Sequence, residues 1–256
     1  MIEQVRDVTV LHQPGGNDIL FAFDVIGGIG PQPGDAVRAE PEDVGYFGAR
    51  VVLAELLALG AAPLFLADLL TVPWQGPGER VVHGMRDLVA DAGLGDLPVT
   101  GSTEENVVAT ATGAGFVAVG EATPGGLRYG LARPGDRIYL LGRPKSAPQD
   151  IVRRGDPEAV SLAALRGIVA DERVKEVLPL GSRGLAHELG EIARRGLRPA
   201  NIALLPQDLF YRSAGPATAV LLVADPLWQP TIGDAPILPL GRLEATRTGL
   251  PDGSYA

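Results

Sequence analysis

The sequence predicts a mixed protein of helices and sheets, of the α/β or α+β class. Its 256 residues are 46% hydrophobic and include 34 Gly and 22 Pro, a composition typical of a compact protein with many loops. One long apolar helix is expected at residues 41–60, with apolar segments of strand length before and after it. A Gly- and Pro-rich stretch at 121–136 has the composition of a domain boundary, so two domains are expected, at 1–122 and 123–256.

Composition and charge argue against several classes of protein. The net charge is −9 and no cluster of Lys or Arg occurs, so no nucleic-acid surface is expected. The chain has no Cys, which leaves neither disulfides nor thiolate metal sites. The first residues, MIEQVRDVTV, lack the apolar core of a signal peptide, and Gly, Pro and acidic residues interrupt the apolar stretch at 51–70. We therefore expect a cytoplasmic protein that does not enter a membrane.

Two strands are expected near the N-terminus, at 5–11 and 19–26, joined by the turn-rich segment HQPGGND. Asp24 stands near the end of the second strand, just before the glycines of IGGIG. A carboxylate at that place can hold a cation or a hydroxyl group, but Asp is also a common residue for starting a turn. The residues alone leave both interpretations of Asp24 open.

The helix at 41–60 has clear signals at both ends. Pro41 suits the first turn because its missing N–H is not needed there, and the two acidic residues after it favour the positive end of the helix dipole. Gly60 supplies a permissive C-terminal residue. Between these ends the only charges are Arg50 and Glu55, which point about 140° apart around the helix and cannot neutralise each other.

Glu55 is the first candidate for a functional side chain. An ionised carboxylate without a partner would be costly inside the apolar run VVLAELLAL, so Glu55 needs a compensating group. That group can be a metal ion, a basic side chain or a neighbouring subunit. The alternative is a structural ion pair, or a position less buried than the pattern indicates.

A polar segment follows a buried strand at 63–73 and an amphipathic helix at 78–92. Its residues offer close backbone approach, hydroxyl groups and hard oxygen ligands: Gly101, Ser102, Thr103, Glu104, Glu105 and Asn106. Such a loop suits Mg²⁺ and phosphate, because Mg²⁺ prefers a few carboxylates together with phosphate oxygens and water. The alternative is a polar, solvated hairpin turn. After this segment we expect a long strand, or a bent pair of strands, at 107–122.

The second half of the chain alternates between strands and helices. We expect a strand at 137–142, helices at 157–170 and within 181–196, and late strands at 218–225 and 236–244.

Common nucleotide-binding motifs are missing or misplaced. No GxxxxGK[ST] sequence occurs, so a P-loop is not expected. Gly113, Gly115 and Ala118 match GxGxxA, but they lie inside an expected strand and do not open a helix, which argues against a dinucleotide-binding site.

Three stretches of the chain resemble one known superfamily. The segment PEDVGYFGARVVLAELLALGAAP is similar to its PEDIG…NLSDIAAMGA.P helix, and VTGSTEEN stands where it has GGDT or GGET. ARPGDRIYLLG resembles its ARPGD.I.VTG, which opens the second domain. The superfamily contains aminoimidazole ribonucleotide (AIR) synthase, thiamine-monophosphate kinase, selenophosphate synthetase and a hydrogenase maturation protein. The matches cover about residues 18 to 145, in order.

The resemblance implies an α+β fold. Its N-terminal domain, at 1–122, would bind ATP and Mg²⁺ and dimerise through its sheet into a barrel with packed helices. A shortened α/β sandwich domain would follow at 123–256. In this superfamily ATP lies near the dimer interface, and clustered acidic residues hold Mg²⁺ around its phosphates.

Four acidic residues are the metal ligands that the resemblance implies. Asp24 falls on the acidic residue of the second strand and Glu55 on the Asp of NLSD, while Glu104 lies in the GGDT region. Asp18 corresponds to an early GDD motif of the superfamily, of which this chain keeps only one carboxylate. The nucleotide-binding residues implied in the same way are Gly101, Ser102, Thr103 and Asn106. No catalytic residue is assigned.

The chain also departs from the superfamily pattern. Glu replaces Asp at position 55, and LPLGSRGLAHEL lies where many members have DISDGL..DL. Gly181 and Arg183 therefore stand near positions usually held by acids that help to define the substrate end. The second domain is shorter than usual. These changes indicate a divergent branch with a different acceptor, or an inactive one.

The expected function is ATP- and Mg²⁺-dependent phosphoryl transfer to a small molecule by a homodimer. The first specific acceptor is α-ribazole, a nucleoside used in cobalamin salvage, because a short branch of the superfamily phosphorylates it. A thiamine-monophosphate kinase-like activity is the alternative acceptor assignment. The rival from another class is a non-catalytic, nucleotide-binding or structural dimer that kept the fold.

Overall fold

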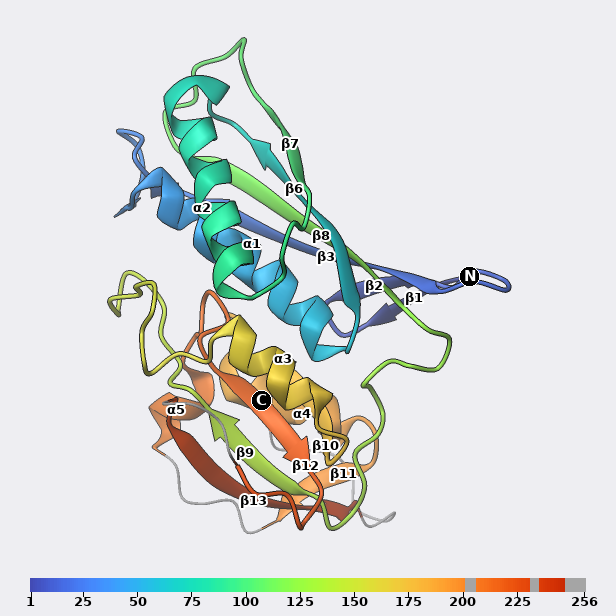
Figure 1. The fold of residues 1–256 in the computed structure, drawn as a ribbon. Coiled ribbons are helices and arrows are strands. Elements are labelled where there is room, and N and C mark those ends of the chain that lie inside the picture. Colours follow the sequence, from blue (N-terminus) through green and yellow to red (C-terminus); the bar gives the residue numbers. More distant parts are fainter. Residues whose placement is uncertain (201–205, 231–234, 247–256) are drawn as a thin grey trace. The chain divides into compact units, whose positions relative to one another are not determined.

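The computed structural model describes three stretches of the chain: 1–200, 206–230 and 235–246 (Figure 1). The chain divides into two compact units. The first consists of Met1–Leu127 with Ser161–Arg166, and the second of Arg128–Val160 with Gly167–Ala256. Among the described helices, none is both long enough and apolar enough to cross a membrane.

The first unit is built on a six-stranded sheet. In the order in which they pair, its strands are β1 (Ile2–Val5), β2 (Val8–Leu11), β3 (Asp18–Gly27), β8 (Gly113–Ala122), β6 (Ala62–Leu70) and β7 (Val99–Thr103). All neighbours run antiparallel except β6 and β7, which are parallel. Three small elements complete the unit: β4 (Ile29–Gly30), β5 (Val37–Arg38) and the π-helical turn η1 (Trp74–Gly78).

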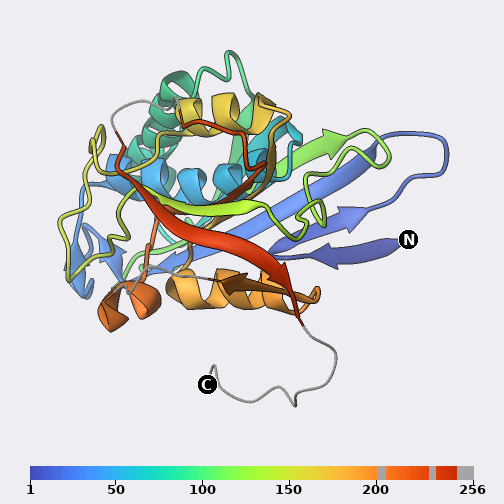
Figure 2. The same cartoon turned by 90° about the horizontal axis from the view of Figure 1, so that it is seen from below.

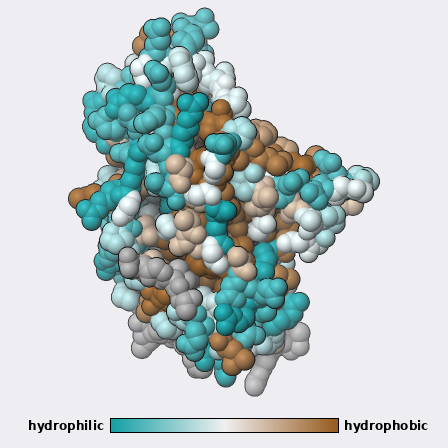
Figure 3. All heavy atoms as spheres, in the orientation of Figure 1, coloured by the Kyte–Doolittle hydropathy of each residue, from teal (hydrophilic) through white to brown (hydrophobic). Residues whose placement is uncertain are grey.

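Two helices, α1 (Pro41–Ala58) and α2 (Glu79–Asp91), lie on one face of this sheet (Figures 1 and 2). The expected helix at 41–60 is confirmed, because α1 starts at the predicted proline and ends just before the predicted glycine. α2 buries its apolar side, and the surface over it is mostly hydrophilic in the space-filling view (Figure 3). Among the described residues, no helix of this unit lies on the opposite face of the sheet.

Two glycines allow α1 and α2 to approach closely. A Cβ atom on Gly45 would overlap the carbonyl oxygen of Val81, and one on Gly84 would overlap that of Glu42. The helices are also tied by the hydroxyl of Tyr46, which donates to the Asp91 carboxylate at 2.9 Å. The backbones of α1 and α2 are therefore in direct contact at these two glycines, and no flexible side chain lies between them that could move aside.

Replacing Gly84 with Ala is expected to destabilise the protein. The added methyl group must push α1 and α2 apart, and overpacking of this kind costs about 1–3 kcal/mol. The control is Gly190→Ala in the second unit, where a Cβ meets nothing within 4 Å and a small gain is expected. Urea unfolding curves measure both variants, and equal stability of the two would contradict the packing argument.

The second unit has a five-stranded antiparallel sheet. In pairing order its strands are β10 (Val174–Pro179), β12 (Val220–Ala224), β9 (Arg137–Leu141), β13 (Ile237–Ala245) and β11 (Leu197–Ala200). Its helices are α4 (Gly184–Ala193) and α5 (Gln207–Tyr211), and the helix α3 (Leu162–Ala170) is divided between the two units after Arg166. The apolar side of α4 packs into the core of this sheet through Leu185, Leu189 and Ile192. Helix on sheet in both units confirms the α+β class.

Several sequence-based boundaries were wrong. The expected strand at 5–11 is a hairpin of β1 and β2, because Arg6 adopts a left-handed φ of 53° and turns the chain. The expected helix at 157–170 begins only at Leu162. In the region 107–122, the strand β8 starts at Gly113. The strands β10 and β11 and the short helix α5 were not anticipated.

Candidate functional site

Glu55 is held among charged groups of the first unit. It lies in α1 and is half-buried. Burial raises the pKa of its carboxyl group to about 7; Arg6 acts in the opposite direction, while Asp7 and Asp24 raise the pKa further. The compensating group that the sequence demanded is therefore only partly supplied by Arg6, and the acids around Glu55 add negative charge.

Asp24 lies on β3 and belongs to the same group of charges. It shares the helix-covered face of the sheet with Leu20 and Ala22, because alternate residues of a strand face the same side. Burial raises the pKa of Asp24, and nearby Asp7 raises it further, while a hydrogen bond from the amide of Val25 lowers it. The structure thus brings Asp24 and Glu55 into electrostatic contact across the helix–sheet interface.

Asp68 is a third acid on this face, and the sequence did not single it out. The ladder aligns Asp24 with Phe116 on β8, Phe116 with Asp68 on β6, and Asp68 with Gly101 on β7. Two strand spacings, about 10 Å, separate the backbones of Asp24 and Asp68. The Asp68 side chain is 1% exposed, and its Oδ2 accepts no hydrogen bond within the described residues. Burial raises its pKa to about 6.

Gly101 has a specific structural role beside Asp68. A Cβ atom at position 101 would lie 2.5 Å from the Asp68 carboxylate, so only glycine leaves space for that carboxylate. An isolated acid in the apolar strand PLFLADLLTVP was the available signal for Asp68, and it is the same signal that marked Glu55.

The expected loop at 101–106 is partly strand and partly a self-contained turn. Gly101, Ser102 and Thr103 belong to β7. The Glu104 carboxylate accepts hydrogen bonds from the amides of Asn106 at 2.6 Å and Val107 at 3.2 Å. These bonds lower the pKa of Glu104, as is usual for a carboxylate that accepts backbone N–H groups.

Glu105 is used in a similar way. Its carboxylate accepts hydrogen bonds from the hydroxyl of Thr103 at 2.6 Å and from the amide of Trp74 at 2.8 Å. These bonds lower its pKa, the Thr103 hydroxyl contributing most. In this structure both acids of STEEN therefore shape the turn.

Asp18 lies at the other end of β3, six residues from Asp24 and so about 20 Å away along the strand. Its carboxylate is buried and pairs with Nδ1 of His12 at 3.1 Å. Nε2 of His12 in turn contacts Glu3 at 2.9 Å. The structure therefore separates Asp18 from the predicted metal ligands Asp24 and Glu55.

The described residues contain no group of three or more His, Cys, Asp or Glu side chains that could hold a metal ion. Mg²⁺ in nucleotide enzymes is usually bound by one or two carboxylates together with substrate phosphates. Asp24 and Glu55, with their raised pKa values, are the carboxylates that fit this description.

Comparison with known proteins identifies the class to which this architecture belongs. Residues 6–120 match the family model described as AIR synthase related protein, N-terminal domain. The thiamine-monophosphate kinase of Bacillus subtilis (strain 168) is 31% identical over 183 residues, which are 60% of this chain and 53% of that kinase. The match thus spans about half the length of the kinase.

Solved structures agree on the fold. Thiamine monophosphate kinase from Aquifex aeolicus superposes with a TM-score of 0.67 at 16% identity, over 95% of this chain and 90% of that chain. The complex of AaThiL with AMPPCP and TMP gives 0.64 at 15% identity, over 93% and 84% of the two chains. Hydrogenase maturation protein HypE in complex with ATP gives 0.62 at 16% identity, over 92% and 78%.

The N-terminal part of the chain therefore matches the AIR synthase related N-terminal domain, the chain is similar in sequence to a thiamine-monophosphate kinase, and its fold is similar to that of the solved kinase structures. The resemblance drawn from its three sequence motifs is thereby confirmed, and so is the AIR synthase-like fold.

Proposed function

We propose that this protein is an ATP- and Mg²⁺-dependent phosphotransferase that acts on a small molecule. The observation that carries the proposal is the pairing of Asp24 and Glu55 on the helix-covered face of the first unit, each with a raised pKa. Acids with raised pKa values next to like charges are typical of a functional site. The relationship to a thiamine-monophosphate kinase supports phosphoryl transfer as the reaction.

The chain would contribute mainly binding and orientation. Asp24 and Glu55 would hold Mg²⁺, with Asp68 as a further carboxylate on the same face. When bound, Mg²⁺ supplies positive charge that offsets the charge of the phosphates. The exposed Ser102, together with Gly101, Thr103 and the side chain of Asn106, would line the phosphates, and the Thr103 hydroxyl would then exchange its hydrogen bond to Glu105 for one to a phosphate oxygen. Phosphoryl transfer asks for little covalent chemistry from the protein, so positioning and electrostatic stabilisation are sufficient roles.

Two acceptors are candidates. The short second domain and the lack of acids near Gly181 and Arg183 favour α-ribazole. Both features fit a branch of the superfamily in which the part of the site that binds the substrate has changed. The sequence identity to the Bacillus subtilis enzyme favours thiamine monophosphate. A non-catalytic, nucleotide-binding dimer is the alternative outcome, and it is supported by the same missing acids.

A kinase assay with radiolabelled ATP and both acceptors tests the proposal. We expect transfer of the γ-phosphoryl group to one of them in the presence of Mg²⁺, and a decrease of at least a hundredfold in Asp24→Asn. Bound ATP without transfer to either acceptor would favour the non-catalytic dimer. A wild-type rate that does not depend on Mg²⁺ would contradict the proposed roles of Asp24 and Glu55.

We further propose that the protein is a homodimer joined through the open face of the first unit's sheet. Phe23 and Val25 project from β3 on that face and are 59% and 75% exposed. Val25 is aligned through Gly115 of β8 with Leu69 of β6, which is also exposed. An apolar stripe across three strands is typical of an interaction surface. A second copy of the sheet would cover it and would provide the missing part of a barrel.

A further inference from the structure

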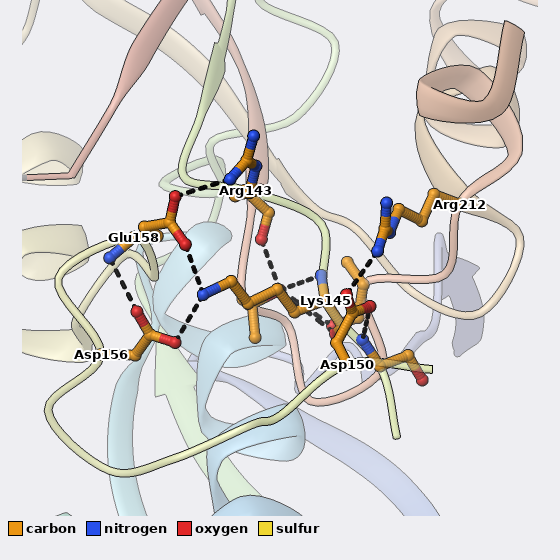
Figure 4. A network of polar contacts seen from close by, with 9 residues as sticks. Arg143, Lys145, Asp150, Asp156, Glu158 and Arg212 are labelled. Atoms are coloured by element: carbon orange, nitrogen blue, oxygen red, sulfur yellow. Dashed lines mark hydrogen bonds and ion pairs between the residues drawn. The ribbon is translucent and has the colours of Figure 1, made fainter. Parts of the chain in front are cut away.

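The second unit contains a polar cavity that the proposed ATP chemistry does not use. It has a volume of about 490 Å³. Seven residues line it: Arg143, Lys145, Gln149, Asp150, Ile151, Glu158 and Arg212. The volume lies within the usual range for small-molecule sites, about 300–1,000 Å³. Figure 4 shows how its charged side chains converge from the segment after β9 and from the segment after α5.

The floor of the cavity is fixed by a buried ion pair. The side chain of Lys145 is 14% exposed and that of Asp156 is 4% exposed. Nζ of Lys145 lies 2.8 Å from Oδ2 of Asp156 and 2.6 Å from Oε2 of Glu158 (Figure 4). The amide of Lys145 also donates to the hydroxyl of Thr218 at 3.0 Å. These contacts hold the ammonium group in one place without relying on solvent.

The rim is different, because its two arginines are held only by surface pairs. Nη1 of Arg143 lies 2.8 Å from Oε1 of Glu158, and the Arg143 side chain is 63% exposed. Nη2 of Arg212 pairs with Asp150, and the Arg212 side chain is 41% exposed. Exposed pairs of this kind contribute about 0–1 kcal/mol. A phosphate group can therefore compete with either carboxylate for its arginine, while Glu158 keeps its contact with Lys145 and Asp150 keeps its hydrogen bond from the Ser146 amide.

The local charge supports an anionic ligand. The lining residues carry three positive and two negative side chains, so the cavity surface is positive by one charge, whereas the whole chain is −9. A third nearby acid, Asp156, pairs with Lys145 from behind and is not part of the lining, so the positive charge that faces a ligand is that of the two arginines. Gln149 and the exposed Ile151 provide amide and apolar surface for the remainder of a ligand.

We propose that this cavity binds a small polar phosphomonoester, with the phosphate between Arg143 and Arg212 above Lys145. The carboxylates of Asp150 and Glu158 would then accept hydrogen bonds from hydroxyl groups of the ligand. The proposal does not rest on the proposed kinase activity, because none of these residues belongs to the first unit.

The test is a ³¹P NMR titration of the full-length protein with inorganic phosphate and with glycerol 3-phosphate, in EDTA and without nucleotide. We expect saturable line broadening for both probes, with tighter binding of glycerol 3-phosphate. The double variant Arg143→Gln/Arg212→Gln should bind at least tenfold more weakly. The matched control is Arg173→Gln, because Arg173 is an exposed arginine of the second unit paired with Asp171 at 2.8 Å, and it should bind as wild type.

Two further variants separate this proposal from its rivals. Glu158→Gln removes a carboxylate that competes for Arg143, so it should tighten phosphate binding several-fold, whereas a purely structural network would give no gain. Asp24→Asn should leave phosphate binding unchanged. Broadening that does not saturate, an equal response in the double variant and Arg173→Gln, or a loss of binding in Asp24→Asn would each overturn the proposal.

Discussion

The Glu55→Gln variant is expected to lose most of the stabilisation that Mg²⁺ and ATP together give to the wild-type protein. In the wild type, ligand at 100 times its dissociation constant adds about 2.7 kcal/mol, which for a protein of this size raises Tm by roughly 5–10 °C. The amide of Gln keeps the shape of the side chain but cannot supply the negative charge that Mg²⁺ requires. Thermal unfolding with each ligand alone and with both measures the difference.

The control for this experiment is Glu79→Gln. Glu79 is an exposed acid in the first turn of α2, so the same chemical change at that position should leave the ligand response intact. A full wild-type shift in Glu55→Gln would remove Glu55 from the metal site. A shift that needs only ATP would show that the nucleotide binds without a cation held by the protein.

The pH dependence of the Mg²⁺-free protein gives a second view of Glu55. Burial raises its pKa from about 4.5 in the unfolded chain to about 7 in the folded one. The folded state therefore holds the proton more tightly, so stability falls as the pH rises from about 4.5 to about 7 and is level above that range. The share of this loss that is due to Glu55 amounts to about 3 kcal/mol and should be absent in Glu55→Gln, while the decreases due to Asp24 and Asp68, whose pKa values are also raised, should remain. Urea unfolding midpoints at a series of pH values measure it.

The sequence predicts the first unit better than the second, for physical reasons that particular residues show. The helix α1 has a proline start, a glycine end and an almost unbroken apolar body, so its place and its odd carboxylate could both be identified. Strand β11, in contrast, is only Leu197–Ala200, follows a run of arginines and contains a proline. Its strand character comes from pairing with β13, which local sequence does not reveal.

The site shows the same limit. Glu55 was recognised because its carboxylate contradicts its apolar surroundings, and Asp24 because it stands near a strand end, just before glycines. The relation of Asp68 to Asp24 depends on both residues pairing with Phe116, and that register is set by the whole sheet. Glu104 and Glu105 had the right chemistry for a metal, but their use in local hydrogen bonds depends on the conformation of the turn and on Trp74, which lies far away in sequence. The residue types therefore predict which side chains could bind a metal, whereas only the fold determines which of them lie close together.

The Phe23→Asp variant is expected to convert a dimer into a monomer. A charge in the middle of an apolar interface must be desolvated, and twofold symmetry places a second copy of the same charge nearby, so we expect dimer affinity to fall at least a thousandfold. Sedimentation velocity of the wild type and the variant measures this. The matched control is Leu227→Asp, a change of an exposed apolar residue in the second unit, which is 79% exposed and should leave the dimer intact.

This variant also separates assembly from nucleotide binding. Phe23 and Asp24 are neighbours on β3, so their side chains point to opposite faces of the sheet, one to the open face and the other toward the helices. A monomeric Phe23→Asp protein that still gains stability from Mg²⁺ and ATP would show that one subunit holds the complete nucleotide site. Loss of both properties together would show that the second subunit supplies part of it. A wild-type protein that is already monomeric would refute the dimer, and the open face would then need another partner.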